Sequence, residues 1–268
     1  MLKKRIIFTL LYCDGFFVQS RNFNLQKVGD VTWLEKNYEF KKISYYIDEL
    51  IILDISRKKK DLDKFLKNVN LITKFCFMPI SVGGGINNFD LVKKILSKGA
   101  DKVVINSNLR FDLIKKISET YGAQSIIASI DFKKVSNKFE IFNQNGSNKL
   151  KLSARSYLIS LTKFPVGEFL LNSIDRDGTG NGLDFDILKY VPKNLDKSLI
   201  ISGGCGNSKH LSEGLKNKKI DAVSTANLLN FVGDGLKKAR EEMINNKFNL
   251  PRWDVDVIDK LGRSLNEN

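Results

Sequence analysis

Two glycine-rich segments of this 268-residue chain have the composition of phosphate-binding loops. Gly83–Gly85 follows the aliphatic run that ends at Val82, and Gly203–Gly204 follows the run that ends at Ser202. A backbone without Cβ atoms lets N–H groups approach an anion closely, and the N-terminus of a following helix adds a favourable dipole. Each segment alone would also suit a simple tight turn, but two loops at matched positions favour phosphate binding.

Polar residues near these loops would complete the phosphate sites. Asn106, Ser107, Thr225 and Asn227 follow further aliphatic runs, and the Asp177-Gly178 turn lies in the distinctive segment 173–182. That segment could also be a solvated loop, although its place after a predicted strand favours a role in the site. The predicted phosphate-binding residues are therefore Gly84, Gly85, Asn106, Ser107, Asp177, Gly178, Gly203, Gly204 and Asn227.

Asp131 is the candidate acid–base residue. It ends the run Ser125–Asp131, and a carboxylate at the end of a buried strand can donate or accept a proton. A shift of 120 residues sets this run beside Arg5–Leu11, in the same way that it sets Gly83–Gly85 beside Gly203–Cys205. The counterpart of Asp131 in this internal repeat is Leu11, which cannot transfer a proton.

The elements that must position these residues follow from the pattern of the whole chain. Short β-branched runs alternate with amphipathic, lysine-rich segments, which is typical of parallel βα units. Eight strands in two similar halves predict one (β/α)₈ TIM barrel with a two-fold half-barrel repeat, whose chemistry gathers where the strands end. We expect strands near 5–11, 49–54, 78–82, 102–106, 125–131, 167–173, 199–202 and 222–225, and helices that include 61–74, 89–98 and 109–121.

Length and composition fit a single domain. A chain of this size with 42% hydrophobic residues can bury one full core, and no linker-like segment interrupts it. We expect the barrel to occupy residues 1–250 and a tail of unknown role to occupy residues 251–268.

The net charge of +14 does not by itself indicate nucleic-acid binding, because the basic residues are spread along the chain among acidic ones. The longest lysine run is Lys58–Lys60. A phosphorylated small molecule or an acidic partner protein is the better expectation, and we predict no nucleic-acid partner.

Few residues suit a metal site or a disulfide. Cys13, Cys76 and Cys205 form no CxxC pair, and His210 is the single histidine, which we expect on a helix surface. We predict no metal and no cofactor. The apolar run after Lys3-Lys4-Arg5 is short for a signal peptide and reads better as a first strand. No segment approaches the length of a membrane span, so we expect a cytoplasmic protein without a membrane partner.

The glycine-rich loops and the segment 173–182 resemble those of the cyclase subunit of imidazole glycerol phosphate synthase, and the resemblance extends over about residues 1–245. The form Ser-Ile-Asp-Arg-Asp-Gly-Thr is similar to the cyclase rather than to the sister isomerase of histidine biosynthesis. The matching motifs are Lys4–Ile7, Asn22-Phe23, Gly29-Asp30, Asp48–Asp54, Val82–Ile86, Gly99–Val103, Asn106-Ser107, Ile130-Asp131, Ser173–Thr179 and Ser202–Gly204.

The resemblance implies a partner and a gate. In the family, a glutaminase subunit of the class I amidotransferase type docks on the bottom of the barrel and sends ammonia along its axis. Four charged residues guard the bottom entrance, and the matching positions here are Arg5, Glu49, Lys102 and Glu168. All four keep a charge, which we interpret as an ammonia gate. They could instead be exposed charges at strand starts that happen to pair.

The chain departs from the family where the chemistry takes place. The resemblance matches the family's first-strand aspartate to Leu11, the lysine before the Asn-Phe motif to Gln19, and a serine of the second phosphate loop to Asn227. Asp14 belongs to the Asp-Gly turn, where we expect a structural role. Loss of one member of an acid–base pair costs about 10²–10⁴ in rate, so cyclase activity would be poor.

Three hypotheses follow. The first is a lyase- or amidotransferase-type synthase subunit that receives ammonia and delivers it to an acceptor other than the histidine precursor. The resemblance implies such an acceptor, because cyclase-like and glutaminase-like subunits of surface-polysaccharide pathways supply ammonia to a third enzyme that amidinates an acetamido sugar. The second is a true cyclase of histidine biosynthesis, with Asp131 acting alone or with water. The third, a basic binding protein without catalysis, leaves the paired loops and the charged quartet unexplained.

Overall fold

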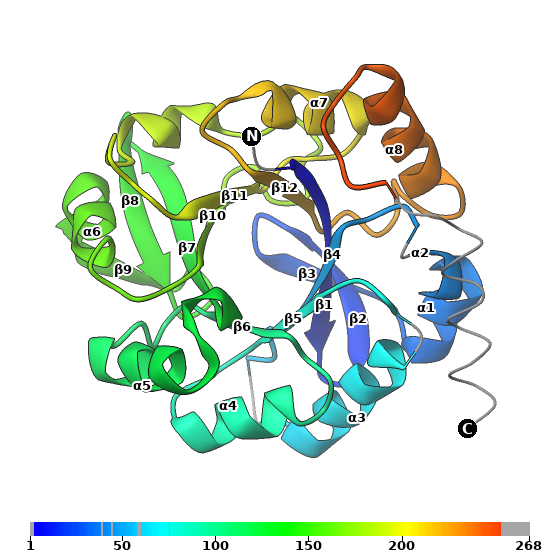
Figure 1. Cartoon of the computed structure of the whole chain (residues 1–268), viewed down its shortest axis with the longest axis horizontal. Helices are drawn as coiled ribbons and strands as arrows, with labels where there is room; N and C mark the ends of the chain where they lie inside the picture. The colour runs from blue at the N-terminus through cyan, green and yellow to red at the C-terminus, as the bar shows by residue number, and fades with distance from the viewer. Residues whose placement is uncertain (1–2, 39, 44, 58–59, 75, 253–268) are drawn as a thin grey trace.

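The β-branched and leucine-rich runs form the strands of a closed parallel barrel (Figure 1). The computed structural model describes residues 3–38, 40–43, 45–57, 60–74 and 76–252. The ring closes because β12 pairs with β1 and β7 pairs with β10, so the predicted (β/α)₈ architecture is confirmed. Its strands are β1 (Arg5–Cys13), β4 (Glu49–Asp54), β5 (Ile80–Gly83), β6 (Lys102–Ile105), β7 (Ile126–Val135), β10 (Glu168–Ser173), β11 (Ser198–Ser202) and β12 (Ala222–Thr225).

Helices surround this ring. They are α1 (Val31–Tyr38), α2 (Phe40–Ile43), α3 (Leu62–Thr73), α4 (Phe89–Leu96), α5 (Phe111–Tyr121), α6 (Ala154–Leu161), α7 (Ser208–Lys216) and α8 (Gly235–Asn245). Several begin at a residue whose side chain caps the first turn, such as Asn88 for α4 and Asn207 for α7. A 3₁₀ turn, η2 (Phe185–Lys189), connects β10 to β11, and another, η1 (Ala123–Ser125), precedes β7.

Two β-hairpins that are not among the strands expected from the sequence extend the barrel. β2 (Phe16–Arg21) pairs with β3 (Asn24–Gly29), and β8 (Lys138–Asn143) pairs with β9 (Asn148–Ser153). Each hairpin is paired to the extended end of a barrel strand, β2 to β1 and β8 to β7. Because β1 and β7 are counterparts in the repeat, the hairpins extend the two-fold similarity beyond the aligned residues.

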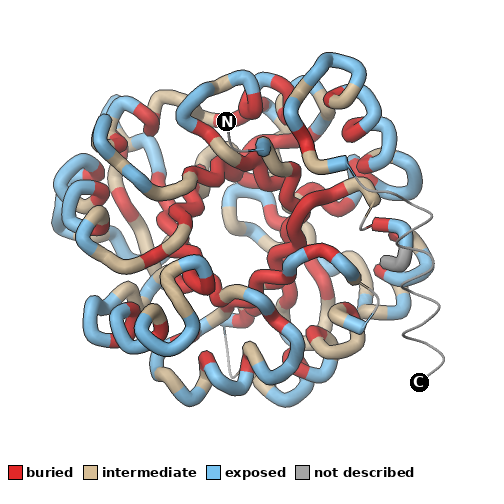
Figure 2. The backbone as a smooth tube through the Cα atoms, viewed as in Figure 1, coloured by how far each residue is buried: buried red, intermediate tan, exposed pale blue. Residues whose placement is uncertain are grey.

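Buried residues follow the strands of the barrel (Figure 2). Their side chains form two separate cores. The larger core lies between the strands and the helices. The smaller one fills the inside of the barrel, because alternate residues of each strand point inward. Its members are Ile7, Ile51, Val104, Ile127, Leu170, Ile200 and Ala222, with Leu53 packed against them.

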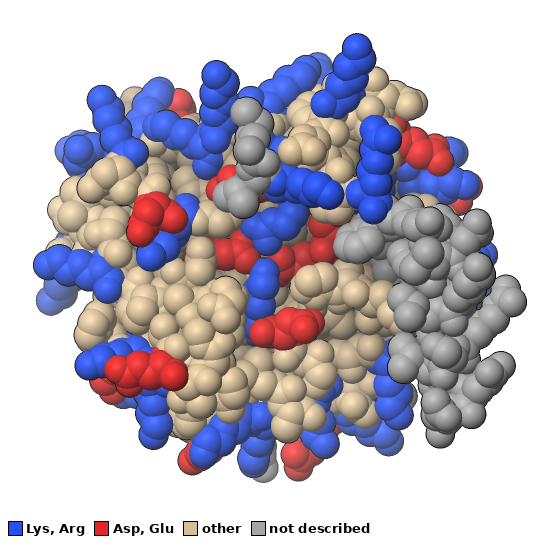
Figure 3. All heavy atoms as spheres, in the orientation of Figure 1, with Lys and Arg blue, Asp and Glu red and all other residues tan. Residues whose placement is uncertain are grey.

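Basic side chains are distributed around the visible face rather than gathered in one stripe, and acidic side chains lie between them (Figure 3). This distribution agrees with the interpretation of the charge made from the sequence. Of the predicted tail, Pro251 and Arg252 are described, and residues 253–268 lie outside the described residues.

Candidate functional site

A cavity of about 280 Å³ opens at the carboxyl ends of the barrel strands. All eight barrel strands or the loops that follow them contribute to its wall, as the barrel geometry requires. The structure brings together at this cavity every residue that the sequence predicted for catalysis or phosphate binding: Gly84, Gly85, Asn106, Ser107, Asp131, Asp177, Gly178, Gly203, Gly204 and Asn227.

Close backbone approach explains why the two predicted phosphate loops need glycine. A Cβ at Gly84, where φ is +130°, would lie 2.5 Å from the carbonyl oxygen of Asp54. A Cβ at Gly203, where φ is +92°, would lie 2.5 Å from the carbonyl oxygen of Ser173. Each loop therefore packs its backbone against the end of a neighbouring strand while its other side lines the cavity.

Asp131 is held by two amide side chains at the end of β7. Asn172 Nδ2 donates to Oδ1 at 2.9 Å, and Asn106 Nδ2 donates to Oδ2 at 3.2 Å. Burial is the largest cause that raises the pKa of Asp131, to about 6, and the nearby charge of Asp177 raises it further. The hydrogen bonds from Asn172 and Asn106 lower the pKa and oppose part of this rise. A carboxyl group that titrates near neutral pH can both accept and donate a proton.

Leu11 lies across the cavity from Asp131. The strands that carry them are opposite in the ring, because β4, β5 and β6 separate them on one side and β12, β11 and β10 on the other. Leu11 is buried and lines the cavity, so its position offers an apolar surface. Asp14 is exposed in the turn after β1, where its N–H donates to Ser56 Oγ at 3.0 Å, and it does not line the cavity.

Gln19 also lines the cavity, but its amide is engaged with the backbone. Its Oε1 accepts from the Leu228 N–H at 2.9 Å, which joins β2 to the loop after β12. The neutral side chain at this position thus fixes the first hairpin to the barrel.

Several predicted phosphate-binding side chains contact protein groups. Asp177 accepts from Ser20 Oγ and from the Phe23 N–H, so it attaches the first hairpin to the loop after β10. Burial raises the pKa of Asp177, and these two bonds oppose the rise. Asn227 Oδ1 accepts from the Asn230 N–H at 3.0 Å. The backbone N–H groups of the glycine loops, rather than these side chains, are the donors best placed for an anion.

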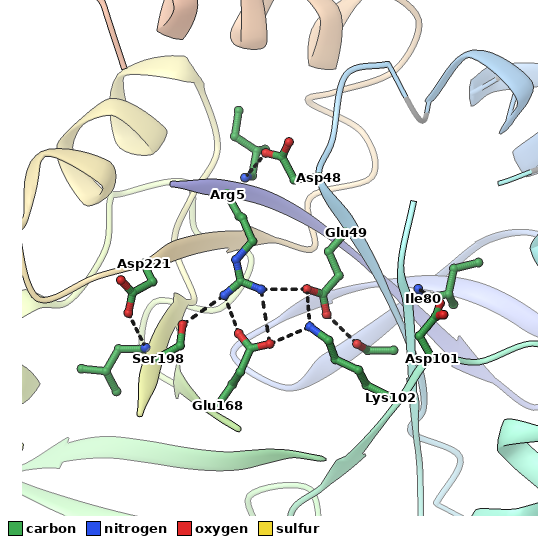
Figure 4. A network of polar contacts seen from close by, with 12 residues as sticks. Arg5, Asp48, Glu49, Ile80, Asp101, Lys102, Glu168, Ser198 and Asp221 are labelled. Carbon is green, nitrogen blue, oxygen red and sulfur yellow. Dashed lines mark hydrogen bonds and ion pairs between the residues drawn. The ribbon is translucent and has the colours of Figure 1, made fainter. Parts of the chain in front are cut away.

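The four predicted gate residues meet at the opposite end of the barrel (Figure 4). Arg5 bonds Glu49 at 3.0 Å and also bonds Glu168, while Lys102 bonds Glu49 at 2.9 Å and Glu168 at 2.6 Å. Each cation therefore contacts both anions, and the charged ring is closed. Ser81 Oγ donates to Glu49 at 2.5 Å, which supports the ring from β5.

The pKa values of Arg5, Lys102 and Glu168 are all shifted in the direction that favours their charged forms. Burial works against the charge of Arg5 and of Lys102, yet the bonds and charges of Glu49 and Glu168 outweigh it and raise both pKa values. Burial likewise works against the charge of Glu168, but Arg5 and Lys102 hold the pKa of Glu168 below its ordinary value. Alternating charges in contact thus stabilise one another where burial alone would neutralise them.

An apolar collar separates the charged ring from the cavity. It consists of the barrel-interior core that includes Ile7, Ile51 and Ile127. Ala222 contributes only a methyl group to this layer. A neutral molecule of the size of ammonia crosses such a layer at less cost than an ion, because an unpaired charge is expensive to bury.

Other classes of site are not found among the described residues. They contain no group of three or more histidine, cysteine, aspartate and glutamate side chains placed to hold a metal ion. None of the helices in the described part of the chain is both long and apolar enough to cross a bilayer.

The structure also reveals residues that the sequence analysis did not select. Asn172 pairs in register with Asp131 on the adjacent strand, and Arg57 and Lys60 line the cavity from the loop between β4 and α3. Asn172 could have been predicted from its place near the end of a strand, because side chains at the ends of neighbouring parallel strands meet at one rim of the barrel. The loop containing Arg57 and Lys60 was interpreted only as part of a dispersed basic surface.

The closed barrel with a polar cavity at one end and a charged ring at the other defines a TIM-barrel protein whose candidate site lies at the carboxyl ends of the strands. Comparison with known proteins specifies the family. A family model described as "Histidine biosynthesis protein" matches residues 5–233. The chain belongs to this family and is a HisF-like, cyclase-type subunit within it.

Individual relatives agree over nearly the whole chain. A protein of Parasynechococcus marenigrum (strain WH8102), provisionally named imidazole glycerol phosphate synthase subunit hisF2, is 48% identical over 94% of this chain and 95% of its own length. The imidazole glycerol phosphate synthase subunits HisF of Chlorobium limicola and Pelodictyon phaeoclathratiforme are each 34% identical over 90% of this chain and 96% of their own length.

Proposed function

We propose that this chain is the synthase subunit of a glutamine amidotransferase complex. A class I glutaminase subunit docks at the floor of the barrel, and ammonia passes through the charged ring and the apolar collar to an acceptor beside Asp131. The observation that carries the proposal is the alignment of three features along one axis: the ring of Arg5, Glu49, Lys102 and Glu168, the collar, and the cavity.

The collar supplies a reason for the direction of transfer. Ammonium would lose its hydration among Ile7, Ile51 and Ile127 without gaining a counter-ion, whereas neutral ammonia crosses at smaller cost. Beyond the collar the wall becomes polar, with Thr9 Oγ1 and Ser224 Oγ 2.7 Å apart. Ammonia that reaches this layer meets hydrogen-bonding groups before it reaches Asp131.

The acceptor that we favour is an acetamido sugar that is amidinated for surface polysaccharide. Support comes from the apolar side chain of Leu11 opposite Asp131, because the resemblance to cyclases implies an aspartate at that position. A cavity in which Leu11 stands opposite Asp131 suits delivery of ammonia better than a ring closure that needs two opposed acids. In this assignment the chain delivers ammonia, and a third enzyme completes the amidination of the sugar.

Reconstitution with a glutaminase subunit tests the proposal. The purified chain is mixed with the glutaminase encoded nearest to it, and glutamine hydrolysis is measured with and without the chain. We expect faster hydrolysis, a complex on gel filtration and no imidazole product. Unchanged hydrolysis together with separate elution of the two proteins would exclude the proposed role.

A second candidate function is the cyclase of histidine biosynthesis. The names of the relatives from Chlorobium and Pelodictyon favour it, as does the pKa of Asp131 of about 6, which would let one carboxyl group serve in turn as acid and base. Rescue of a histidine auxotroph that lacks its cyclase would establish this function.

A further inference from the structure

A continuous row of polar side chains lies at the inner end of the cavity, directly above the apolar collar. On each of six adjacent strands, the residue two positions after a collar residue carries a hydroxyl or an amide group, and it lines the cavity because side chains two residues apart on a strand point to the same side. In the order of the ring, this polar row consists of Asn106 on β6, Ser129 on β7, Asn172 on β10, Ser202 on β11, Ser224 on β12 and Thr9 on β1.

Three members of the polar row are engaged with other protein groups. Thr9 Oγ1 and Ser224 Oγ are 2.7 Å apart, so one of these hydroxyls donates to the other. Asn106 Nδ2 is shared between the carbonyl oxygen of Ser129 at 3.1 Å and Asp131 Oδ2 at 3.2 Å. These bonds fix the two ends of the row.

The other three members keep hydrogen-bonding groups free. Within the described part of the chain, neither Ser129 Oγ nor Ser202 Oγ has a hydrogen-bond partner. Each of these serines is only 8% exposed, and each lines the cavity. Asn172 donates to Asp131 through Nδ2 at 2.9 Å, which leaves its carbonyl oxygen Oδ1 without a donor among the described residues. Three buried oxygens therefore face the cavity with unused lone pairs.

These oxygens lie beside the carboxylate of Asp131. Asn172 pairs in register with Asp131 on β7 and with Ser202 on β11. Ser129 stands two residues before Asp131 on the same face of β7. A carboxylate, an amide oxygen and two hydroxyls accept N–H groups, and the hydroxyls can also donate to a lone pair. This end of the cavity thus fits a small ligand rich in N–H bonds.

We infer that the polar row is a binding site for one molecule of ammonia or ammonium. Asn172 Oδ1 and the hydroxyls of Ser129 and Ser202 accept its N–H groups, and the carboxylate of Asp131 supplies the charged acceptor. This inference rests on the proposed function, since it names the place where the transferred nitrogen is held. Nitrogen that leaves the collar is captured here and meets the acceptor from below.

Ammonium chloride is the probe that tests the inference, by solution NMR of the full chain. The side-chain amide of Asn172 and the carboxyl carbon of Asp131 report on the site, and sodium chloride keeps the ionic strength constant. Potassium chloride is the comparison, because K⁺ has the charge and nearly the size of ammonium but no N–H bonds. We expect saturable shifts with ammonium at roughly millimolar concentration, and binding of potassium that is weaker by about fivefold or more.

Substitution of the free hydroxyls tests the residues themselves. The double variant Ser129→Ala, Ser202→Ala should weaken ammonium binding about fivefold or more, because two acceptors are lost. Ser202→Thr keeps the hydroxyl and should retain most of the affinity. Ser212→Ala removes a buried serine on α7, outside the barrel, and is the matched control, with an expected change of about twofold or less.

Three outcomes would overturn the inference. They are equal binding of potassium and ammonium, a double variant that binds ammonium as well as Ser212→Ala does, and the absence of a saturable shift in the wild-type chain. These measurements use the chain without a glutaminase. Their failure is therefore separate from a failure of glutaminase stimulation, which tests the proposed function itself.

Discussion

Phe23, at the tip of the first hairpin, packs against Gly146, at the tip of the second. A Cβ at Gly146 would lie 2.7 Å from the Phe23 ring, so the two tips are in contact at the cavity wall. The hairpins extend from β1 and β7, which are counterparts in the internal repeat. The two halves of the chain therefore meet at the mouth of the cavity as well as in the barrel.

The close packing of the first hairpin against the loop after β10 depends on Gly178. A Cβ there would lie 1.8 Å from the carbonyl oxygen of Ser20, whereas a Cβ at Gly180 would have no atom within 4 Å. Both glycines have positive φ, at +65° and +67°. We expect Gly180→Ala to cost about 1–2 kcal/mol from backbone strain alone. Gly178→Ala should cost more than about 3 kcal/mol, because backbone must also move. Urea unfolding of both variants measures the difference, and equal losses would contradict this account of the contact.

Asp131 should make stability depend on pH. Its native pKa of about 6 exceeds the unfolded value, so the wild-type protein is most favoured below about pH 4 and loses stability as pH rises to about 6. Asp131→Asn removes this loss. We expect the variant to gain about 1–2 kcal/mol at pH 8 and nothing at pH 4. The rise of the Asp131 pKa to about 6 corresponds to about 3 kcal/mol, and part of this is offset because the new amide cannot accept hydrogen bonds from both Asn106 and Asn172. Thermal melts at both pH values, with the exposed Asp90→Asn as control, would refute this if the gain were independent of pH.

The charged ring should contribute to stability through Glu168, which contacts both cations. Glu168→Gln leaves Arg5 and Lys102 with one carboxylate between them. We expect a loss of about 2–4 kcal/mol, because removal of one partner strands a buried charge. Glu140→Gln breaks a partly exposed pair with Lys149 and should cost less than about 1 kcal/mol. Similar losses in urea unfolding would argue against a tightly coupled ring.

A buried ion pair anchors the end of the barrel near residue 251. Arg240 bonds Asp48 at 2.9 Å and also donates to the carbonyl oxygen of Pro251, while the second Asp48 oxygen accepts from the Ile6 N–H at 2.7 Å. Burial raises the pKa of Asp48, and Arg240 opposes the rise.

Arg240→Ala should therefore destabilise the protein by about 3–5 kcal/mol at pH 7. Without its cation the Asp48 carboxyl group has a higher native pKa, so the defect should shrink as pH falls towards 4, where the group is protonated. Urea titrations at both pH values check the trend. The exposed Arg110→Ala is the control, and a defect of constant size would contradict the role assigned to Asp48.

The sequence predicted the barrel well because its strands are marked by hydrophobicity. Buried runs such as Leu50–Ile52 and Val103–Ile105 have few alternatives to parallel strands inside a ring of helices. The hairpins were missed because β3, β8 and β9 mix polar with apolar residues, and because the positive φ angles of Asn22, Phe23 and Ser136 are not evident from a single sequence.

The candidate site was predictable where it depends on strand ends. Asp131 and the glycine loops follow buried runs, so the barrel topology was enough to bring them together. The orientation of Lys60 over Gly85 depends on the course of a loop that no periodicity describes. The approach of Phe23 to Gly146 likewise requires the tertiary structure.

Growth without histidine tests the central claim most directly. The chain and its Leu11→Asp variant are expressed with a glutaminase partner in an auxotroph that lacks the cyclase. If the chain supplies ammonia but lacks the second acid of a cyclase, the wild type does not support growth and Leu11→Asp does. Growth with the wild-type chain, at a rate that the substitution does not improve, would contradict the account.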